Sequence, residues 1–225
     1  YYNDRFDLHP GDRVWVDGKL AEHPGIVTAV NYSFRINLAD YKRVIARIDT
    51  DVHGSFVMGG SHFITFDRGT TERGQVRLWF APPTEENAEF VCGSDTDTAF
   101  PLHDLRRMGV DAGTAERGHD YYRENRVLYL ALDGDKGYAL VEGREIYEVE
   151  FTYRNGEVSD LICSCFCGGK CKHAFAAMLQ LEEMLALIEK QYAAAFAESN
   201  YFAAICKGTL FAYAIDGKES GSFTL

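Results

Sequence analysis

The feature that most constrains this chain is a dense run of cysteines that ends in a histidine. The run is Cys163-Ser164-Cys165-Phe166-Cys167-Gly168-Gly169-Lys170-Cys171-Lys172-His173, and it holds four of the six cysteines in a chain of 225 residues. Disulfide frameworks spread their cysteines along short secreted chains, whereas a cluster this tight in a longer chain is typical of a metal site. We therefore expect reduced thiols and a cytoplasmic protein.

The spacing within this run indicates how its side chains share one ion. Residues two apart on a strand point to the same side, so Cys163 and Cys165 present two sulfurs together. Gly168-Gly169 lets the backbone turn back, and Cys171 and His173 supply a second pair at the start of a helix. Three thiolates and one imidazole close a tetrahedral shell, which is the donor set of a structural zinc site. Soft sulfur donors favour zinc over calcium or magnesium.

A hairpin and a helix are predicted to flank the cluster. Residues 147–153 alternate between apolar and polar side chains, and Asn155-Gly156 suits both central positions of a type I′ turn. This predicts an antiparallel hairpin of residues 147–154 and 157–163 that delivers Cys163 to its far end. Apolar residues at three- and four-residue steps predict a helix over 174–192. The Ala-rich composition of residues 193–206 predicts that the helix continues there. Residues 210–215 are predicted to form a strand and turn, or else to begin a further segment of a longer chain.

Together, the C-x-C and C-x-H pairs, the hairpin before them and the Ala/Leu-rich helix after them resemble the SWIM zinc finger. The similarity covers about residues 118–190. Gly118-His119-Asp120-Tyr121-Tyr122 with Arg126-Val127 resembles the family's entry, and residues 171–177 resemble its C-K-H-x-x-A helix start. The resemblance implies metal ligation by Cys163, Cys165, Cys171 and His173. Cys167 falls in the variable connector, where it is either a bystander or an alternate ligand that exchanges with Cys165.

The resemblance also implies a role. SWIM domains occur in proteins resembling bacterial Swi/Snf-type helicases, plant Mu-type transposases and ubiquitin-pathway proteins, and they are associated with DNA binding or protein contact. We therefore expect a non-catalytic binding module, as the accessory region of a Swi/Snf-type DNA-dependent ATPase. The chain begins at Tyr1 without a methionine, which fits a fragment of a longer protein.

Residues 9–110 indicate a second, β-rich part of the chain. Short β-branched or aromatic runs are bounded there by glycine and proline, which predicts a small barrel or sandwich. The opening Gly11–Val16, followed by Gly25-Ile26-Val27, resembles the first hairpin of an SH3-like barrel. The predicted strands are 14–16, 25–30, 44–48, 63–66 and 76–80.

These patterns predict an α+β chain of three parts. Residues 1–117 form a β-rich domain of unknown role with a linker from 84, residues 118–190 form the zinc-binding domain, and residues 191–225 form a helical tail that leads into a longer chain.

Charge narrows the choice of partner. The formal net charge is −11 and the sequence pI is about 5.1, and acidic residues exceed basic ones within residues 118–190 as well. This balance favours a protein partner or an intramolecular ATPase domain over free duplex DNA, which we expect to bind weakly. Arg154, Lys170 and Lys172 are the candidate partner or nucleic-acid contacts, provided that folding gathers them on one face. The sequence has no apolar run of 18 residues, so we expect no membrane contact.

An enzyme is the competing class. The sequence lacks the G-x-x-x-x-G-K-[ST], D-F-G and G-x-S-x-G motifs, so it shows no recognisable ATPase, kinase or hydrolase signature. A thiol- or zinc-dependent enzyme, or a redox sensor that uses the cysteine cluster, remains as the alternative. A closed four-ligand shell disfavours catalysis, because a catalytic zinc keeps one position open for water or substrate.

Overall fold

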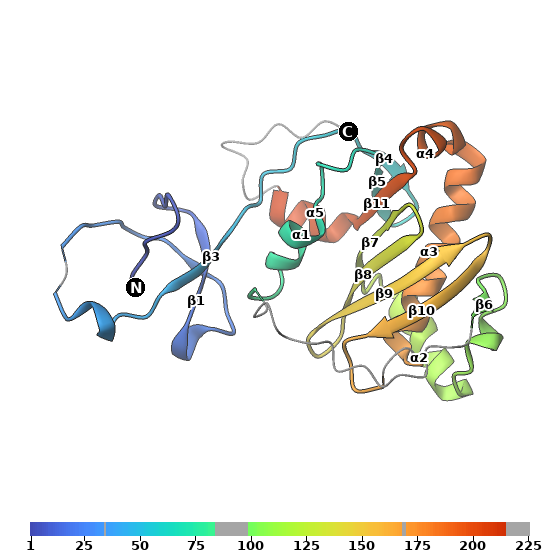
Figure 1. Ribbon diagram of the computed structural model, residues 1–225, viewed down its shortest axis with the longest axis horizontal. Helices are drawn as coiled ribbons and strands as arrows, with labels where there is room; N and C mark the ends of the chain where they lie inside the picture. Colours follow the sequence, from blue (N-terminus) through green and yellow to red (C-terminus); the bar gives the residue numbers. More distant parts are fainter. Residues whose placement is uncertain (34, 84–98, 168–169, 215–225) are drawn as a thin grey trace. The chain divides into compact units, whose positions relative to one another are not determined.

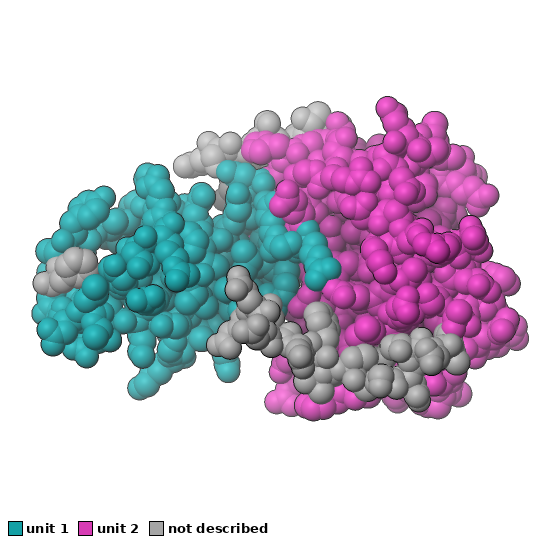
Figure 2. All heavy atoms as spheres, in the orientation of Figure 1, with its two compact units in different colours: residues 1–51, 73–88 teal, residues 52–72, 89–225 magenta. Residues whose placement is uncertain are grey.

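The computed structural model describes residues 1–33, 35–83, 99–167 and 170–214 (Figure 1). The chain forms two compact units, and Figure 2 colours each of them. Unit 1 consists of residues 1–51 and 73–88, and unit 2 consists of residues 52–72 and 89–225. Each unit is therefore built from two separate segments of the sequence.

Unit 1 is a three-stranded antiparallel sheet with one short helix. The strand order is β2-β1-β3, with β1 at Arg13–Val16, β2 at Gly25–Ile26 and β3 at Val44–Ile48, and the helix α1 is Arg73–Leu78. Two short 3-10 helices, η1 (Gly18–Leu20) and η2 (Leu38–Asp40), lie in the connections. The mixed, strand-rich character expected of the whole chain is confirmed, while an SH3-like barrel stays a prediction.

The predicted strand over residues 76–80 is wrong, because most of that run belongs to α1. Val76 and Trp79 lie three residues apart and are both buried, which places them on one side of a helical turn. The indole N–H of Trp79 donates to the carbonyl of Asp49 at 2.7 Å, and that of Trp15 donates to the carbonyl of Leu78, also at 2.7 Å. Burial of the two tryptophans thus overrides the β-propensity of the run.

Unit 2 is built on an eight-stranded antiparallel sheet in the order β4-β5-β11-β7-β8-β9-β10-β6. In that order the strands are Val57–Gly59, His62–Thr65, Tyr201–Cys206, Val127–Asp133, Lys136–Glu142, Ile146–Arg154, Glu157–Cys163 and Phe100–Pro101. The helices are α2 (Ala112–Arg123), α3 (Lys172–Gln191), α4 (Ala193–Ser199) and α5 (Lys207–Ala214), with a 3-10 helix η3 at Leu105–Met108.

The hairpin and the helix predicted on either side of the cluster are confirmed. Asn155 and Gly156 have φ values of 53° and 84°, as a type I′ turn requires, and Arg154 pairs with Glu157 across them. Helix α3 packs on β7, β8, β9 and β10, and in Figure 1 it runs behind these strands. The buried side chains of α3 join those of the strands in one core.

Helix α2 crosses α3 at a glycine. A Cβ on Gly118 would lie 2.6 Å from Cδ1 of Phe175, so only a residue without a side chain allows this close approach. Gly118, the expected start of the zinc-binding domain, therefore lies inside a helix that packs on α3. The compact units do not follow the boundaries expected at 117/118 and 190/191. Residues 84–98 of the predicted linker lie outside the described residues.

The C-terminal part differs most from expectation. The predicted helix over 193–206 ends at Ser199, where Asn200 adopts a left-handed conformation with φ 48°, and residues 201–206 form β11 instead. The predicted strand over 210–215 is also wrong for its described residues, because α5 spans 207–214. Strand β11 inserts between β5 and β7, where all six of its residues are buried.

Candidate metal centre

The first pair of sulfurs is positioned by the end of the β9–β10 hairpin. Cys163 closes β10 opposite Val149. The next residue, Ser164, pairs with Glu148 twice: its N–H donates to the Glu148 carbonyl at 2.9 Å, and its hydroxyl accepts from the Glu148 N–H at 3.0 Å. These bonds extend the ladder by one residue and hold the backbone between Cys163 and Cys165.

The second pair comes from the start of α3. Cys171 is the N-cap residue, and its sulfur accepts a hydrogen bond from the N–H of Ala174 at 3.3 Å. His173 follows in the first turn. The hydrogen bonds from the Cys163 thiol and from the Ala174 N–H lower the pKa of Cys171, but sharing of a proton with Cys165 and burial outweigh them, so the pKa of Cys171 is raised overall.

The structure brings the four predicted ligands together. The ligand atoms of Cys163, Cys165, Cys171 and His173 all lie within 4.8 Å of one another, and all four side chains are buried. Nδ1 of His173 lies 3.9 Å from the Cys163 sulfur and 3.8 Å from the Cys171 sulfur. Ligand atoms around tetrahedral zinc lie about 3.5–3.8 Å apart at normal bond lengths. The four donor atoms therefore have nearly the spacing that a metal ion requires.

The backbone around the sulfurs also favours thiolates. The N–H groups of Cys165, Cys167 and Ala174 hydrogen-bond to the sulfurs of Cys163, Cys165 and Cys171, respectively. Hydrogen bonds from the thiols of Cys163 and Cys171 hold the pKa of Cys165 below its ordinary value, and the same sharing raises the pKa of Cys163. The three thiols thus favour at most one shared negative charge, and a cation among the sulfurs would favour ionisation of all three.

Two tyrosines and a glycine enclose the imidazole. The His173 ring stacks on Tyr147 with centroids 4.0 Å apart and an interplanar angle of 16°, and Tyr121 contacts it at 5.5 Å. Its Nε2 atom is buried and has no hydrogen-bond partner among the described residues. A Cβ on Gly143 would lie only 3.1 Å from that Nε2. Packing therefore fixes the ring with Nδ1 toward the sulfurs.

Positive charge lies next to this aromatic layer. The Lys172 ammonium is 4.6 Å and the Arg126 guanidinium 4.7 Å from the centre of the Tyr121 ring. A divalent ion bound by three thiolates carries one net negative charge. Arg126 is also ion-paired with Glu124, so Lys172, which adjoins two of the ligands in the chain, is the cation of this layer better suited to offset that charge.

Cys167 lies outside the cluster. Its side chain is exposed, whereas those of Cys163, Cys165 and Cys171 are buried. The two glycines predicted to turn the chain back, 168–169, lie outside the described residues. The role of Cys167 as an alternate ligand stays a prediction.

The three candidate contact residues are not brought together. Arg154 lies at the turn of the β9–β10 hairpin, and its guanidinium pairs with Asp135. Lys170 and Lys172 lie at the opposite end, about 20 Å away along the strands at the usual rise per residue. Two of the three candidates thus stay near the metal cluster, and the third belongs to another part of the surface.

Sequence reasoning missed the residues that hold the imidazole. The sequence indicates that Tyr147 lies on the apolar face of its predicted strand. It does not indicate that this face contacts His173. Gly143 lies in the β8–β9 connection, and its proximity to the ring arises only from the folded hairpins.

Comparisons of the chain with protein-family models, with curated proteins and with solved structures find no match. Among the described residues, no helix combines the length and the apolar character needed to cross a bilayer. The assignment of a function therefore rests on the site itself.

Proposed function

We propose that this chain is a zinc-stabilised, non-catalytic binding module. The observation that carries the proposal is the buried group of Cys163, Cys165, Cys171 and His173, whose ligand atoms lie within 4.8 Å of one another. Three soft thiolates and an imidazole suit zinc better than a hard cation. Their reduced state fits a reducing compartment such as the cytoplasm.

The donor set supports a structural role for the ion. Four protein ligands fill the tetrahedral shell and leave no position for water or substrate, whereas a catalytic zinc keeps one open. The ion would tie the end of β10 to the start of α3. Because metal binding is coupled to folding in such sites, the ion contributes directly to the stability of this part of unit 2.

The resemblance to SWIM zinc fingers supports the wider role. On that basis the module contacts a protein partner or an ATPase domain of the same polypeptide, as the accessory region of a Swi/Snf-type enzyme. The net charge of −11 supports a protein contact over tight binding to duplex DNA. Lys170 and Lys172, which flank Cys171 in the chain, are the basic residues proposed for such a contact.

Metal analysis of two matched variants tests the proposal. The full chain purified under reducing conditions is expected to contain one equivalent of zinc. Cys165→Ser should lose the metal or bind it far more weakly, because it removes a buried ligand. Cys167→Ser changes an exposed thiol two residues away and should keep the full equivalent.

Two results would contradict the proposal. One is a protein free of metal after purification and after addition of zinc. The other is retention of the metal in Cys165→Ser together with its loss in Cys167→Ser, which would mean that Cys167 and not Cys165 is the ligand.

A further inference from the structure

A serine and a histidine of unit 2 form a pair that contains no ligand of the metal cluster. Ser61 lies in the turn between β4 and β5, and His62 is the first residue of β5. The Ser61 hydroxyl oxygen lies 2.9 Å from Nδ1 of His62, and Nε2 of the same ring lies 2.7 Å from the carbonyl oxygen of Val127 on β7. The histidine is fully buried and Ser61 is half-buried, so the serine is the member of the pair that reaches the surface.

These two contacts fix the position of the proton on the ring. A carbonyl oxygen can only accept a hydrogen bond, so Nε2 carries the hydrogen that it donates to Val127. A neutral imidazole has a single N–H, which leaves Nδ1 as an acceptor. Burial lowers the pKa of His62 to about 4, so the ring is neutral near pH 7. The Ser61 hydroxyl therefore donates its hydrogen to Nδ1.

This arrangement has the parts of an activated nucleophile. A serine hydroxyl is a weak nucleophile until an adjacent base takes its proton, and the base works when a third group fixes its tautomer and orientation. Here Nδ1 of His62 is the base, and the carbonyl of Val127 is the third group. A serine that only faces solvent has neither partner.

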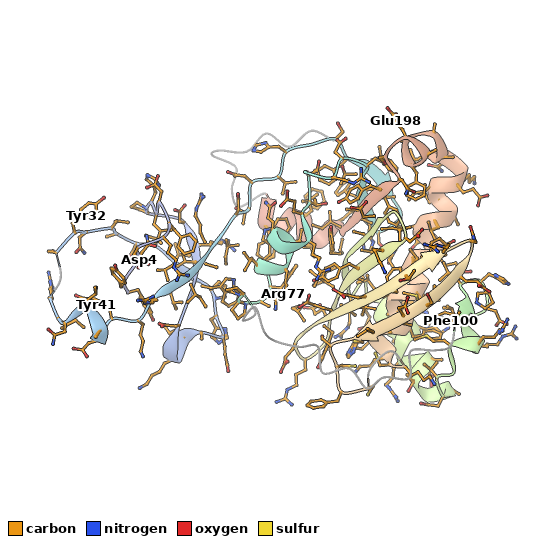
Figure 3. All side chains as sticks on the ribbon, viewed as in Figure 1. Asp4, Tyr32, Tyr41, Arg77, Phe100 and Glu198 are labelled. Carbon is orange, nitrogen blue, oxygen red and sulfur yellow. The ribbon has the colours of Figure 1, made fainter. Side chains whose placement is uncertain are left out.

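Lys207, the first residue of α5, adds positive charge beside the turn. Its ammonium donates to the Gly60 carbonyl at 2.7 Å, and its backbone N–H donates to the Ser61 carbonyl at 3.1 Å. Strands β4, β5 and β11 lie side by side in Figure 1, and Figure 3 shows side chains filling the space around them. Positive charge at this place stabilises the negative charge that develops on an acyl oxygen during attack. Gly60 and Gly208 are exposed, and a Cβ on Gly208 would meet no atom within 4 Å, so a small reagent has room beside the turn.

We propose that Ser61 is a modification site that accepts an acyl group from an activated ester or thioester. The Ser61 oxygen bonds to the acyl carbon, the bond from that carbon to the leaving oxygen or sulfur breaks, and the hydroxyl proton passes through Nδ1 of His62 to the leaving group. The products are a serine ester and a free alcohol or thiol. Because His62 is fully buried, water reaches Nδ1 poorly and the ester persists. A single lasting modification is compatible with a non-catalytic binding module.

Acetylation by p-nitrophenyl acetate tests the proposal on the full chain. Peptide mapping by mass spectrometry at successive times gives the rate at each serine. Ser61 should be acetylated at least about tenfold faster than any other serine; this is below the usual range for general bases, because a low pKa makes His62 a weak base. Hydroxylamine should remove the acetyl group from the Ser61 ester while it leaves acetylated lysines intact.

Three variants locate the reaction. Ser61→Ala should lose the label at this site. His62→Gln keeps an N–H for the Val127 carbonyl but supplies no base, so acetylation of Ser61 should slow at least about tenfold. Ser159→Ala is the matched control, because Ser159 is also half-buried in unit 2 but its hydroxyl faces Asp160 at 3.2 Å and no imidazole. This control should leave the rate at Ser61 unchanged, and circular dichroism should show the same fold in all variants.

Three outcomes would overturn the proposal. One is a Ser61 that reacts no faster than the other serines, a comparison made within the unmodified chain and therefore valid even if a variant fails to fold. Another is an equal rate at Ser61 in the folded His62→Gln variant. The third is continued release of p-nitrophenolate beyond one equivalent that is lost in Ser61→Ala, which would make the pair a hydrolase instead of a modification site. The zinc content of the same preparation is measured separately, so a failure here is distinguishable from a failure of the metal site.

Discussion

The buried histidine of β5 should make the stability of unit 2 depend on pH. His62 is fully buried: its Nε2 donates to the carbonyl of Val127 at 2.7 Å, and its Nδ1 lies 2.9 Å from the hydroxyl oxygen of Ser61. Burial lowers the pKa of His62 from 6.5 to about 4, the bond to Val127 opposes this shift, and the charge of Lys207 adds to it. At about 1.36 kcal/mol per pKa unit, the shift corresponds to about 3 kcal/mol.

The sign of the effect follows from where the proton binds. Below pH 6.5 the unfolded chain protonates this histidine, while the folded chain leaves it neutral until the pH approaches 4. The stability associated with neutral His62 is therefore complete above pH 6.5, falls as the pH drops from 6.5 toward 4, and is fully lost below the folded pKa. By pH 4 the loss amounts to about 3 kcal/mol.

A comparison with His62→Gln isolates this contribution. Glutamine does not titrate and keeps an N–H for the Val127 carbonyl, while all other titrating groups, including the metal ligands, stay the same in both proteins. Urea denaturation followed by far-ultraviolet circular dichroism at a series of pH values gives the free energy of unfolding. The variant should lose about 3 kcal/mol less than the unmodified chain between neutral pH and pH 4. Equal losses in the two proteins would refute the reasoning.

Three further predictions concern the metal centre and its surroundings. Gly143→Ala would place a methyl group 3.1 Å from Nε2 of His173, so we expect zinc affinity to fall by roughly 10- to 100-fold in a competition titration, as for other residues that support metal ligands. Gly208→Ala adds its methyl group in open space and should leave the affinity unchanged; equal affinity of both variants would contradict the placement of the ring. Both tryptophans of the chain belong to unit 1. A strong chelator should therefore increase amide exchange in α3 of unit 2 while tryptophan fluorescence stays constant. If the chelator also changed the tryptophan fluorescence at the same concentration, the two units would unfold together. Duplex DNA should bind weakly and without sequence preference at physiological salt, and charge reversal at Lys170 and Lys172 should weaken that binding further; tight, sequence-selective binding would contradict the protein-contact proposal.

The predictions that succeeded rest on local signals. Asn155-Gly156 specifies its turn through two positive φ values, and the helix after the cluster follows from an apolar repeat that the core of unit 2 uses. The side chains of Cys163, Cys165, Cys171 and His173 come together as expected, because their spacing on a strand and on a helix start already places them on common sides. No contact between distant segments was needed for these three inferences.

The predictions that failed required information from distant segments. The run 76–80 has β-propensity, but its Val76 and Trp79 are buried together in unit 1 only as part of a helical turn. The run 201–206 follows an Ala-rich helix, but it forms a strand because it pairs with β5 on one side and with β7 on the other. Asn200 is a local signal for the end of helix α4, because asparagine readily adopts the left-handed conformation found there. The Ala-rich composition around it favoured a continuous helix instead.

The position of β11 has a consequence for synthesis on the ribosome. It completes the sheet between β5 and β7, yet it emerges roughly 140 residues after β5, which at about 5–20 residues per second means a delay of about 7–30 s. During this interval the β4–β5 hairpin exposes a strand edge that later becomes interior, a state prone to aggregation. Nascent chains stalled before residue 201 should therefore recruit chaperones, and chains released after α5 should not.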